Sequence, residues 1–468
     1  SMYNTAVGYN SGIAVTTGIQ NTFIGGLAGD ANTTANNNTA VGKSSLSATT
    51  TGGENTAVGT NALATNTTAS NNTAVGTNAL KVNTTGNYNV AVGALAGDAN
   101  TTGIRNTAIG HQSLTSNTTG GLNVALGRSA MFSNTTADSN TAVGYEALYA
   151  NTTGANNVAV GANALDANTT GTVNVAVGTA ALGALTTASY NTALGYAALT
   201  TNVTGAQNTA VGYSALTAAT GADNTAVGSQ ALSSVAAGTY NTAVGRSAGA
   251  AITTGVQNTF IGGLAGDATT TTSNNTAVGF EALTTNTTGA SNSAVGRKAL
   301  SSNTTGHSNS AFGADLPGVV AGSALTANTT GLRNSAFGGS SLATNTTGDQ
   351  NTAVGAAALH LSTTADNNTA VGYNALRANT TGAENTVVGA LAGDALTEAD
   401  FNVAVGVAAL SGDTLGSKST ALGYYALATQ NFTSATQVFN TAVGHSAGRQ
   451  ITTGVENTLI GGLAGDAI

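Results

Sequence analysis

The feature that most constrains this chain is a short sequence repeat with a constant step of seventeen positions, as from Asn4 to Asn21. The pentapeptide Asn4-Thr5-Ala6-Val7-Gly8 returns with small variations at Asn21, at Asn38 and onward to Asn457, and about 27 copies fill the 468 residues. The consensus is Asn-Thr-Ala-Val-Gly-x-x-Ala-Leu-x-x-Asn-Thr-Thr-Gly-x-x, whose places are numbered below from the Asn as first to seventeenth. Such an array predicts a solenoid in which each copy stacks on its neighbours and leaves no room for a separate globular domain.

Two corners marked by glycine favour a β-solenoid coil in each repeat. The fifth position is Gly in every copy, from Gly8 to Gly461, which predicts a backbone with positive φ or a close backbone approach. Gly, Thr and Asn disfavour helix, and no apolar stripe recurs at helical spacing. The sequence therefore predicts an all-β fold, a parallel β-solenoid (β-roll) of about 27 coils, with two short strands and two turns in each coil.

Three irregular coils interrupt the constant step within what we predict to be one continuous solenoid over residues 1–468. Coil 208–223 lacks one residue, while coils 309–333 and 419–439 carry insertions. A deletion inside a strand would turn all later side chains to the other face, so we expect it in the corner at 217–220. The insertions, around 315–318 and 430–432, are expected to bulge outward as turns.

Alternation along the first strand predicts two faces. The fourth position is always Val, Ile, Leu or Phe and the ninth is mostly Leu, so we expect these two inside, with the second position partly lining the core. The third position would then form an outward apolar stripe, which is typical of an interface, beside a column of hydrogen-bonded first-position Asn residues. The predicted interface residues are Ala6, Phe23, Ala57, Ala91, Ala210, Phe260, Val387 and Leu459.

Composition argues against several kinds of chemistry. The net charge is −8, from 11 basic and 19 acidic residues, without the basic stripe that nucleic-acid binding needs. There is no Cys, and the four His residues lie far apart, so no metal-ligand spacing occurs. No apolar run approaches the length of about 18 residues that spans a membrane. We therefore expect no enzyme activity, metal, cofactor, nucleic-acid partner or membrane span.

Tyr recurs at the sixth position, just after the glycine turn. Exposed aromatic side chains stack on sugars or anchor protein partners, although covering a turn explains them equally well. The candidate ligand-contact residues are Tyr9, Tyr145, Tyr196, Tyr213, Tyr373 and Tyr424.

Copies with Val at the second position carry a resemblance to a known family. Asn89-Val90-Ala91-Val92-Gly93 is similar to the Ser-Val-Ala-Ile-Gly repeat in head domains of trimeric autotransporter adhesins. The combination of Asn-Thr-Ala-Val-Gly with Asn-Thr-Thr-Gly also resembles repeats of phage tail-fibre-like proteins. The adhesin resemblance implies a left-handed β-roll that winds three chains around one axis. The repeat period of this chain is longer than the usual one of those heads, and no neck, stalk, anchor or chaperone domain is seen.

These observations predict a structural and adhesive rod, exposed outside the cell on a cell surface or a virion. It would form a homotrimer and present many weak contacts to a host-surface protein or glycan. One alternative is an ice-binding solenoid, although the Thr-x-Val pattern differs from the Thr-x-Thr pattern usual for that function. Another is a subunit of an end-to-end extracellular filament.

Overall fold

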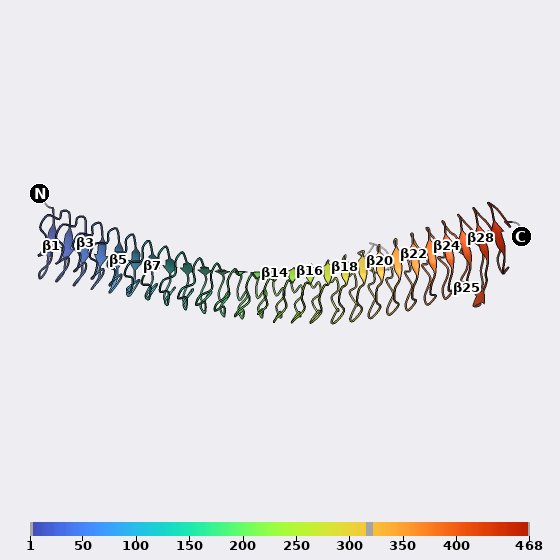
Figure 1. Cartoon of the computed structure of the whole chain (residues 1–468), viewed down its shortest axis with the longest axis horizontal. Coiled ribbons are helices and arrows are strands. Elements are labelled where there is room, and N and C mark those ends of the chain that lie inside the picture. The colour runs from blue at the N-terminus through green and yellow to red at the C-terminus, as the bar shows by residue number, and fades with distance from the viewer. Residues whose placement is uncertain (1–2, 315–321, 467–468) are drawn as a thin grey trace. The chain divides into compact units, whose positions relative to one another are not determined.

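The computed structural model describes residues 3–314 and 322–466, and the chain forms two compact units, residues 1–229 and 230–468. Each unit is a parallel β-solenoid whose coils stack one on the next (Figure 1). The described residues contain strands, turns and bends but no helix. The predicted fold class is thus confirmed, and each regular copy of the repeat makes one coil. The continuity of one solenoid across both units stays a prediction.

In the first unit, each coil contributes one strand of three residues. Successive strands pair in parallel and in register, so that Ala57, Ala74 and Ala91 lie beside one another. The strands are β1 (Thr5–Val7), β2 (Thr22–Ile24), β3 (Thr39–Val41), β4 (Thr56–Val58), β5 (Thr73–Val75), β6 (Val90–Val92), β7 (Thr107–Ile109), β8 (Val124–Leu126), β9 (Thr141–Val143), β10 (Val158–Val160), β11 (Val175–Val177), β12 (Thr192–Leu194), β13 (Thr209–Val211) and β14 (Thr225–Val227).

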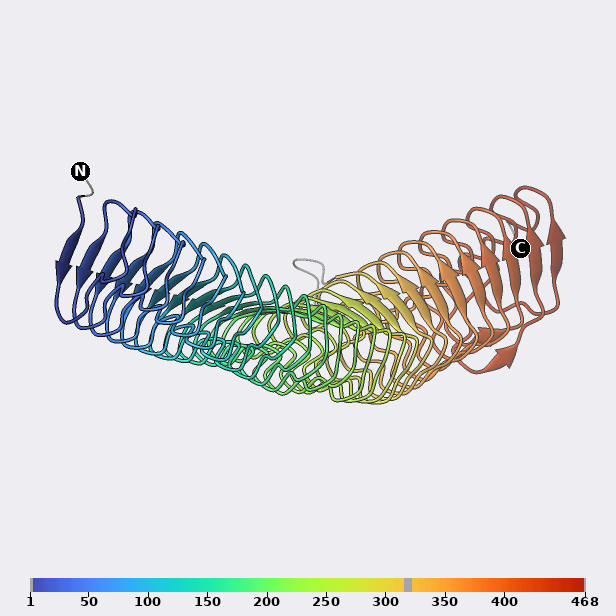
Figure 2. The same cartoon turned by 60° about the vertical axis from the view of Figure 1, so that its left-hand side comes forward.

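The second unit repeats this arrangement and adds one short strand pair. Its main strands are β15 (Thr242–Val244), β16 (Thr259–Ile261), β17 (Thr276–Val278), β18 (Ser293–Val295), β19 (Ser310–Phe312), β20 (Ser335–Phe337), β21 (Thr352–Val354), β22 (Thr369–Val371), β23 (Thr386–Val388), β24 (Val403–Val405), β26 (Thr420–Leu422), β28 (Thr441–Val443) and β29 (Thr458–Ile460). The additional strands, β25 (Gly416–Ser417) and β27 (Thr436–Gln437), pair with each other. They lie away from the main row of arrows (Figures 1 and 2).

The second strand predicted for each coil was wrong. Among the described residues, the second half of a coil contains a strand only at β25 and β27. The reason is local, because the seventh and ninth positions have left-handed backbones, as at Asn61 (φ 56°) and Leu63 (φ 51°). Residues in that region cannot continue an extended strand. Consecutive turns therefore close the coil, and their amides still bond from coil to coil, as Leu63 N does to the Ala79 oxygen at 3.0 Å.

The assignment of the two strand faces was also wrong. Ala57, at the third position of β4, is fully buried, whereas the side chain of Val58 at the fourth position is 36% exposed. Thr56 at the second position is half-buried. The ninth-position Leu63 and the eighth-position Ala62 are buried as the partners of Ala57 in the core. The core is thus lined by small third-position side chains, and the larger fourth-position side chains face solvent.

The narrow interior explains this reversal. Where the third position is Phe, glycines replace the ninth-position Leu in the same coil and in the preceding one. A methyl group on Gly266 would lie 2.6 Å from Phe260 Cε1, and one on Gly249 would lie 2.9 Å from Phe260 Cδ2. Phe23 is enclosed in the same way by Gly12 and Gly29. In these coils, Phe at the third position therefore occupies the space that Leu at the ninth position fills in most other coils.

The first-position Asn residues do form the predicted hydrogen-bonded column, but they lie inside the coil. Asn38 Oδ1 accepts from the backbone N of Asn55 at 2.9 Å, and Asn55 Nδ2 donates to the Ala69 oxygen at 2.9 Å. Each Asn thus links its neighbour's strand to the far corner of its own coil. Such bonds satisfy polar groups that would otherwise be buried without a partner.

A second buried Asn column, at the twelfth position, was not predicted. Asn117 Nδ2 donates to Asn100 Oδ1 at 2.8 Å and to the Gly120 oxygen at 2.9 Å. Asn117 Oδ1 in turn accepts from Asn134 Nδ2 at 2.9 Å. The run extends from Asn66 to Asn168, and it ends where Leu185 replaces the next Asn. Asn168 Oδ1 is accordingly left without a hydrogen-bond partner.

The fifth-position Gly satisfies both conditions that the sequence predicted. Gly59 has φ of 135°, and a methyl group on it would lie 2.5 Å from the Gly76 carbonyl oxygen. A residue with a side chain would therefore be strained and would also collide with the next coil.

The irregular coils preserve strand register. Thr209 pairs with Thr225 across the shortened coil, which places the deletion in the turns as predicted. Ser310 pairs with Ser335 across the first insertion, although residues 315–321, including the predicted bulge, lie outside the described residues. In coil 419–439, residues 433–435 are exposed, just after the segment predicted to bulge. However, Gln430 and Phe432 are buried, contrary to the prediction.

Candidate functional surfaces

The most extensive candidate surface is the outer sheet face, defined as the second- and fourth-position side chains of the main strands. These positions hold only Thr, Val, Ser, Ile, Leu and Phe, without one charged residue. The register stacks like positions on one another, as in the parallel rings of Phe312 and Phe337, whose centroids lie 4.9 Å apart. Apolar columns of this kind on the solvent side are unusual for an isolated soluble chain.

The predicted interface residues do not lie on a free surface. They are the third-position side chains, and they point into the coil of their own chain. Ala6 is exposed and Leu459 is half-buried because they belong to the first and last described coils. The remaining six are buried, namely Phe23, Ala57, Ala91, Ala210, Phe260 and Val387. The predicted interface stripe was therefore wrong.

The sixth-position Tyr residues are exposed along one edge of the outer sheet face. Tyr196 and Tyr213 stack with their ring centroids 5.6 Å apart, Tyr424 stacks on His445 at 5.2 Å, and Arg128 lies 5.6 Å from the centroid of Tyr145. All six candidates have exposed rings, which are those of Tyr9, Tyr145, Tyr196, Tyr213, Tyr373 and Tyr424. Their accessibility agrees with ligand contact, and their role stays a prediction.

Two of these phenols are held in the protonated form. The pKa of Tyr145 is raised chiefly because its hydroxyl hydrogen-bonds to the carboxylate of Glu146. The pKa of Tyr424 is raised chiefly by loss of solvation, with a contribution from Tyr425 beside it.

The seventeenth position forms a second, interrupted column of exposed aromatic residues, at the other end of the strands, which the sequence analysis missed. Its exposed aromatic residues are Tyr88, Tyr190, Tyr240, Phe401 and Phe439. Cations accompany them, since Arg105 lies 5.9 Å from the centroid of Tyr88 and Lys418 lies 5.2 Å from that of Phe439. The recurrence of aromatic residues just before the first-position Asn was the available signal.

The Asp residues of the Leu-Ala-Gly-Asp copies do not converge on a site. Asp98 Oδ1 accepts from the Thr115 hydroxyl at 2.7 Å, and Asp267 Oδ1 accepts from the Thr284 hydroxyl at 2.5 Å. Burial raises the pKa of Asp30 and of Asp394. Over residues 3–314 and 322–466, no group of three or more His, Cys, Asp or Glu side chains could hold a metal ion.

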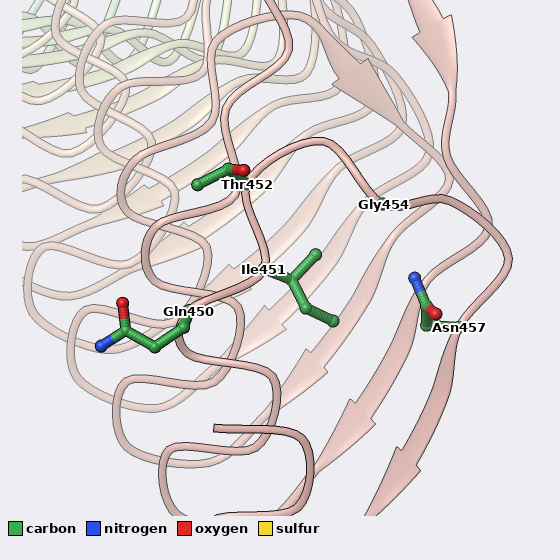
Figure 3. A pocket seen from close by; sticks show the side chains of 5 residues that line it. All are labelled: Gln450, Ile451, Thr452, Gly454 and Asn457. Carbon is green, nitrogen blue, oxygen red and sulfur yellow. The ribbon is translucent and has the colours of Figure 1, made fainter. Parts of the chain in front are cut away.

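Shallow depressions mark the surface of the described residues, among them the following three. One, at the last described coil, has a volume of about 250 Å³ and is lined by Gln450, Ile451, Thr452, Gly454 and Asn457, with Ile451 pointing into the coil (Figure 3). Another, of about 320 Å³, extends from Thr34 to Asn71 along one corner of the coils. The third, of about 280 Å³, surrounds Lys418. The depression at the last described coil is lined by no side chain that titrates near neutral pH, so it offers no acid–base chemistry.

The described residues contain no helix long and apolar enough to cross a bilayer. In comparisons with known proteins, no family model matches the chain, and none of the curated proteins matches it either.

Proposed function

We propose that the chain is a structural and adhesive solenoid that assembles with copies of itself, as a homotrimer, through the outer sheet face. The observation that carries this proposal is the uncharged surface formed by the second and fourth positions. In each unit, fourth-position side chains of successive strands lie on that surface, in columns against which the sheet of another copy can pack. Sheets pack face to face at about 10 Å, and burying such side chains stabilises by roughly 25 cal/mol per Å².

The adhesive part of the proposal rests on the two aromatic columns. They flank the outer sheet face, so they remain accessible at the rim when that face is covered. Many equal contacts along repeated coils add through multivalency, even when each is weak. The similarity of the pentapeptide to adhesin-head and tail-fibre repeats supports a left-handed winding and display on a cell surface or virion.

Light scattering on a size-exclusion column tests the assembly. We expect a mass near three times 45.0 kDa for the unaltered chain. The triple variant Val58→Lys, Val75→Lys, Val92→Lys places three charges on the outer sheet face and should reduce the trimer. The control Thr68→Lys, Thr85→Lys, Thr102→Lys adds the same charge at exposed fourteenth positions and should leave the trimer intact. A monomeric unaltered chain would refute the assembly.

Ice binding is the second candidate, and the exposed outer sheet face favours it more than the sequence did. Second-position Thr residues lie there in columns, one coil apart, at the spacing of about 4.8 Å between parallel strands. A regular Thr and Val surface of this kind can order water in a lattice. A thermal-hysteresis assay decides between the candidates, because a face buried in a trimer cannot contact ice. Activity of a monomer, lost in the Val58→Lys, Val75→Lys, Val92→Lys variant, would establish this second function.

A further inference from the structure

We propose that the depression around Lys418 binds one acidic sugar residue of an anionic polysaccharide. This Lys418 pocket is lined by Asp400, Phe401, Ser417, Lys418, Ala435, Thr436 and Gln437 and has a volume of about 280 Å³. That is slightly below the range of about 300–1,000 Å³ that suits drug-sized ligands, so a single sugar ring matches its size. The inference gives a ligand class to the adhesive function proposed above and rests on that part of it.

The pocket exists because coil 419–439 is irregular. Its insertion forms β27, which pairs with β25 so that Gln437 lies beside Ser417. The backbone N of Val438 donates to the Ser417 oxygen at 2.9 Å, which fixes the inserted segment against the preceding coil. Phe432 and Val438 are buried at either end of the exposed segment and anchor it. The pocket wall is therefore held by packing and by backbone hydrogen bonds.

Lys418 provides a positive charge that no carboxylate neutralises. Its Nζ donates to Gln437 Oε1 at 3.2 Å and lies 5.9 and 5.2 Å from the ring centroids of Phe401 and Phe439. No salt bridge to Lys418 occurs among the described residues. An ammonium group has three donors, so two remain for a ligand. A chain with only 11 basic residues places this one between two aromatic rings, where a ligand carboxylate can reach it.

The other lining groups suit the hydroxyls and the apolar face of a sugar. Asp400 Oδ1 accepts from the Ala383 backbone N at 2.7 Å, which leaves the second carboxylate oxygen directed to other donors. Ser417 Oγ accepts from the Asp400 backbone N at 2.9 Å and can donate its own proton. The ring of Phe401 is exposed and lines the pocket, offering an apolar surface to the C–H face of a sugar.

This combination favours an acidic sugar over its simpler competitors. Inorganic phosphate would use Lys418 but not the Phe401 ring. A neutral sugar would use the ring and the hydroxyl partners but would leave the ammonium unpaired. Only a sugar ring that carries a carboxylate uses the Lys418 ammonium, the Phe401 ring and the hydrogen-bonding groups for hydroxyls together.

Titrations followed by ligand-observed NMR test the proposal, with methyl β-glucuronide, methyl β-glucoside and inorganic phosphate as probes. We expect the glucuronide to bind at least tenfold more tightly than the glucoside, and phosphate not to displace it. Lys418→Gln should remove this preference, whereas Lys81→Gln, at an exposed lysine of the first unit, should not change it. Thermal melting should show that both variants remain folded.

Three results would overturn the proposal. They are equal binding of glucuronide and glucoside, displacement by phosphate, and undiminished binding by Lys418→Gln. The self-association test uses the outer sheet face and no sugar, so the two hypotheses fail separately. Glucuronide binding by the Val58→Lys, Val75→Lys, Val92→Lys variant would show that the pocket functions without the assembly.

Discussion

At the scale of single residues, side-chain size at the third position and at the ninth position varies in opposite directions in the core, which we call the volume exchange. Phe260 is fully buried and fills the space that Leu occupies in other coils, because Gly249 and Gly266 stand where those Leu residues would be. The ninth position accepts Leu in a left-handed backbone elsewhere, as at Leu283 (φ 55°). The exchange is therefore limited by space and not by backbone conformation.

This exchange predicts a rescue. Phe260→Ala should lower the free energy of unfolding by about 3–5 kcal/mol, because it leaves a cavity. Gly266→Leu alone should also destabilise, since its Cβ would lie 2.6 Å from the Phe260 ring. The double variant Phe260→Ala, Gly266→Leu restores the common arrangement and should recover much of the loss. Urea unfolding of the four proteins in a double-mutant cycle measures the coupling; additive effects would contradict the exchange.

The same exchange shows why the faces of the strand were assigned wrongly. Alternation with a period of two groups the second position with the fourth and the first with the third, and this grouping was correct. It does not say which group is inside, and the larger fourth-position side chains suggested the wrong one. The correct signal was present, because Phe23, Phe260 and Leu459 all occur in copies with Gly at the ninth position. Two positions whose side-chain sizes vary in opposite directions must be in contact. Because the ninth position lies in the core, the third position must lie there too.

Asp394 provides a prediction about pH. Loss of solvation raises its pKa above the ordinary value of 3.8, while hydrogen bonding and Arg377 oppose the shift. The folded chain therefore retains this proton at pH values where the unfolded chain releases it, so this group's contribution to stability falls as pH rises from 3.8 through the raised pKa. Asp394→Asn should melt at a higher temperature than the unaltered chain at pH 7.

That advantage of Asp394→Asn should disappear near pH 3.5, where the carboxyl is protonated in both states. Glu54→Gln changes an exposed acid and serves as the control. Melting curves recorded between pH 3.5 and 7 provide the comparison. An advantage that did not depend on pH would mean that the carboxylate is not the cause.

At the scale of elements, the buried Asn column of the twelfth position behaves as a directional chain of hydrogen bonds. Each Nδ2 donates to the preceding coil, so the last Asn of a run keeps an unpaired oxygen. Asn168 Oδ1, at the end of the run before Leu185, has no partner, and neither does Asn379 Oδ1, which stands alone between Ser362 and Leu396. Leu185 and Leu396 are themselves fully buried, so the column accepts an apolar side chain sterically.

Asn117→Leu should consequently destabilise the first unit by about 1–3 kcal/mol, because it leaves Asn100 Oδ1 without its donor inside the coil. Leu185→Asn is the matched opposite change. Leu185→Asn should lower the free energy of unfolding by less than the loss of a buried Leu normally does, because the new Asn gives Asn168 Oδ1 a donor. Urea midpoints of both variants measure the difference. Equal stability of Asn117→Leu and the unaltered chain would show that the column contributes nothing to stability.

The strands and their register could be predicted from the repeat, whereas the second half of the coil could not. In copy after copy, the pentapeptide determines the strand, the glycine turn and the in-register stacking. The left-handed conformations at residues such as Asn61 and Leu63 have no sequence signature, because Leu rarely adopts them. The Lys418 pocket was missed for a related reason. It depends on the pairing of β25 with β27, which arises only after an insertion has been placed.

At the scale of the whole molecule, each coil contacts only its neighbours, so stability should be a sum of coil and interface contributions. The two compact units each contain a complete set of such contacts. We therefore expect residues 1–229, expressed alone, to fold into the same solenoid. Loss of the second unit should leave the coils around Ala91 unchanged.

Far-UV circular dichroism and amide hydrogen exchange test this expectation. The fragment should show a β spectrum per residue close to that of the full chain, and protection at β5 to β9 should match between the two proteins. A fragment that is unfolded throughout would mean that stability is cooperative over the whole chain. The solenoid would then have to be treated as one folding unit, and single-coil substitutions would act on all coils together.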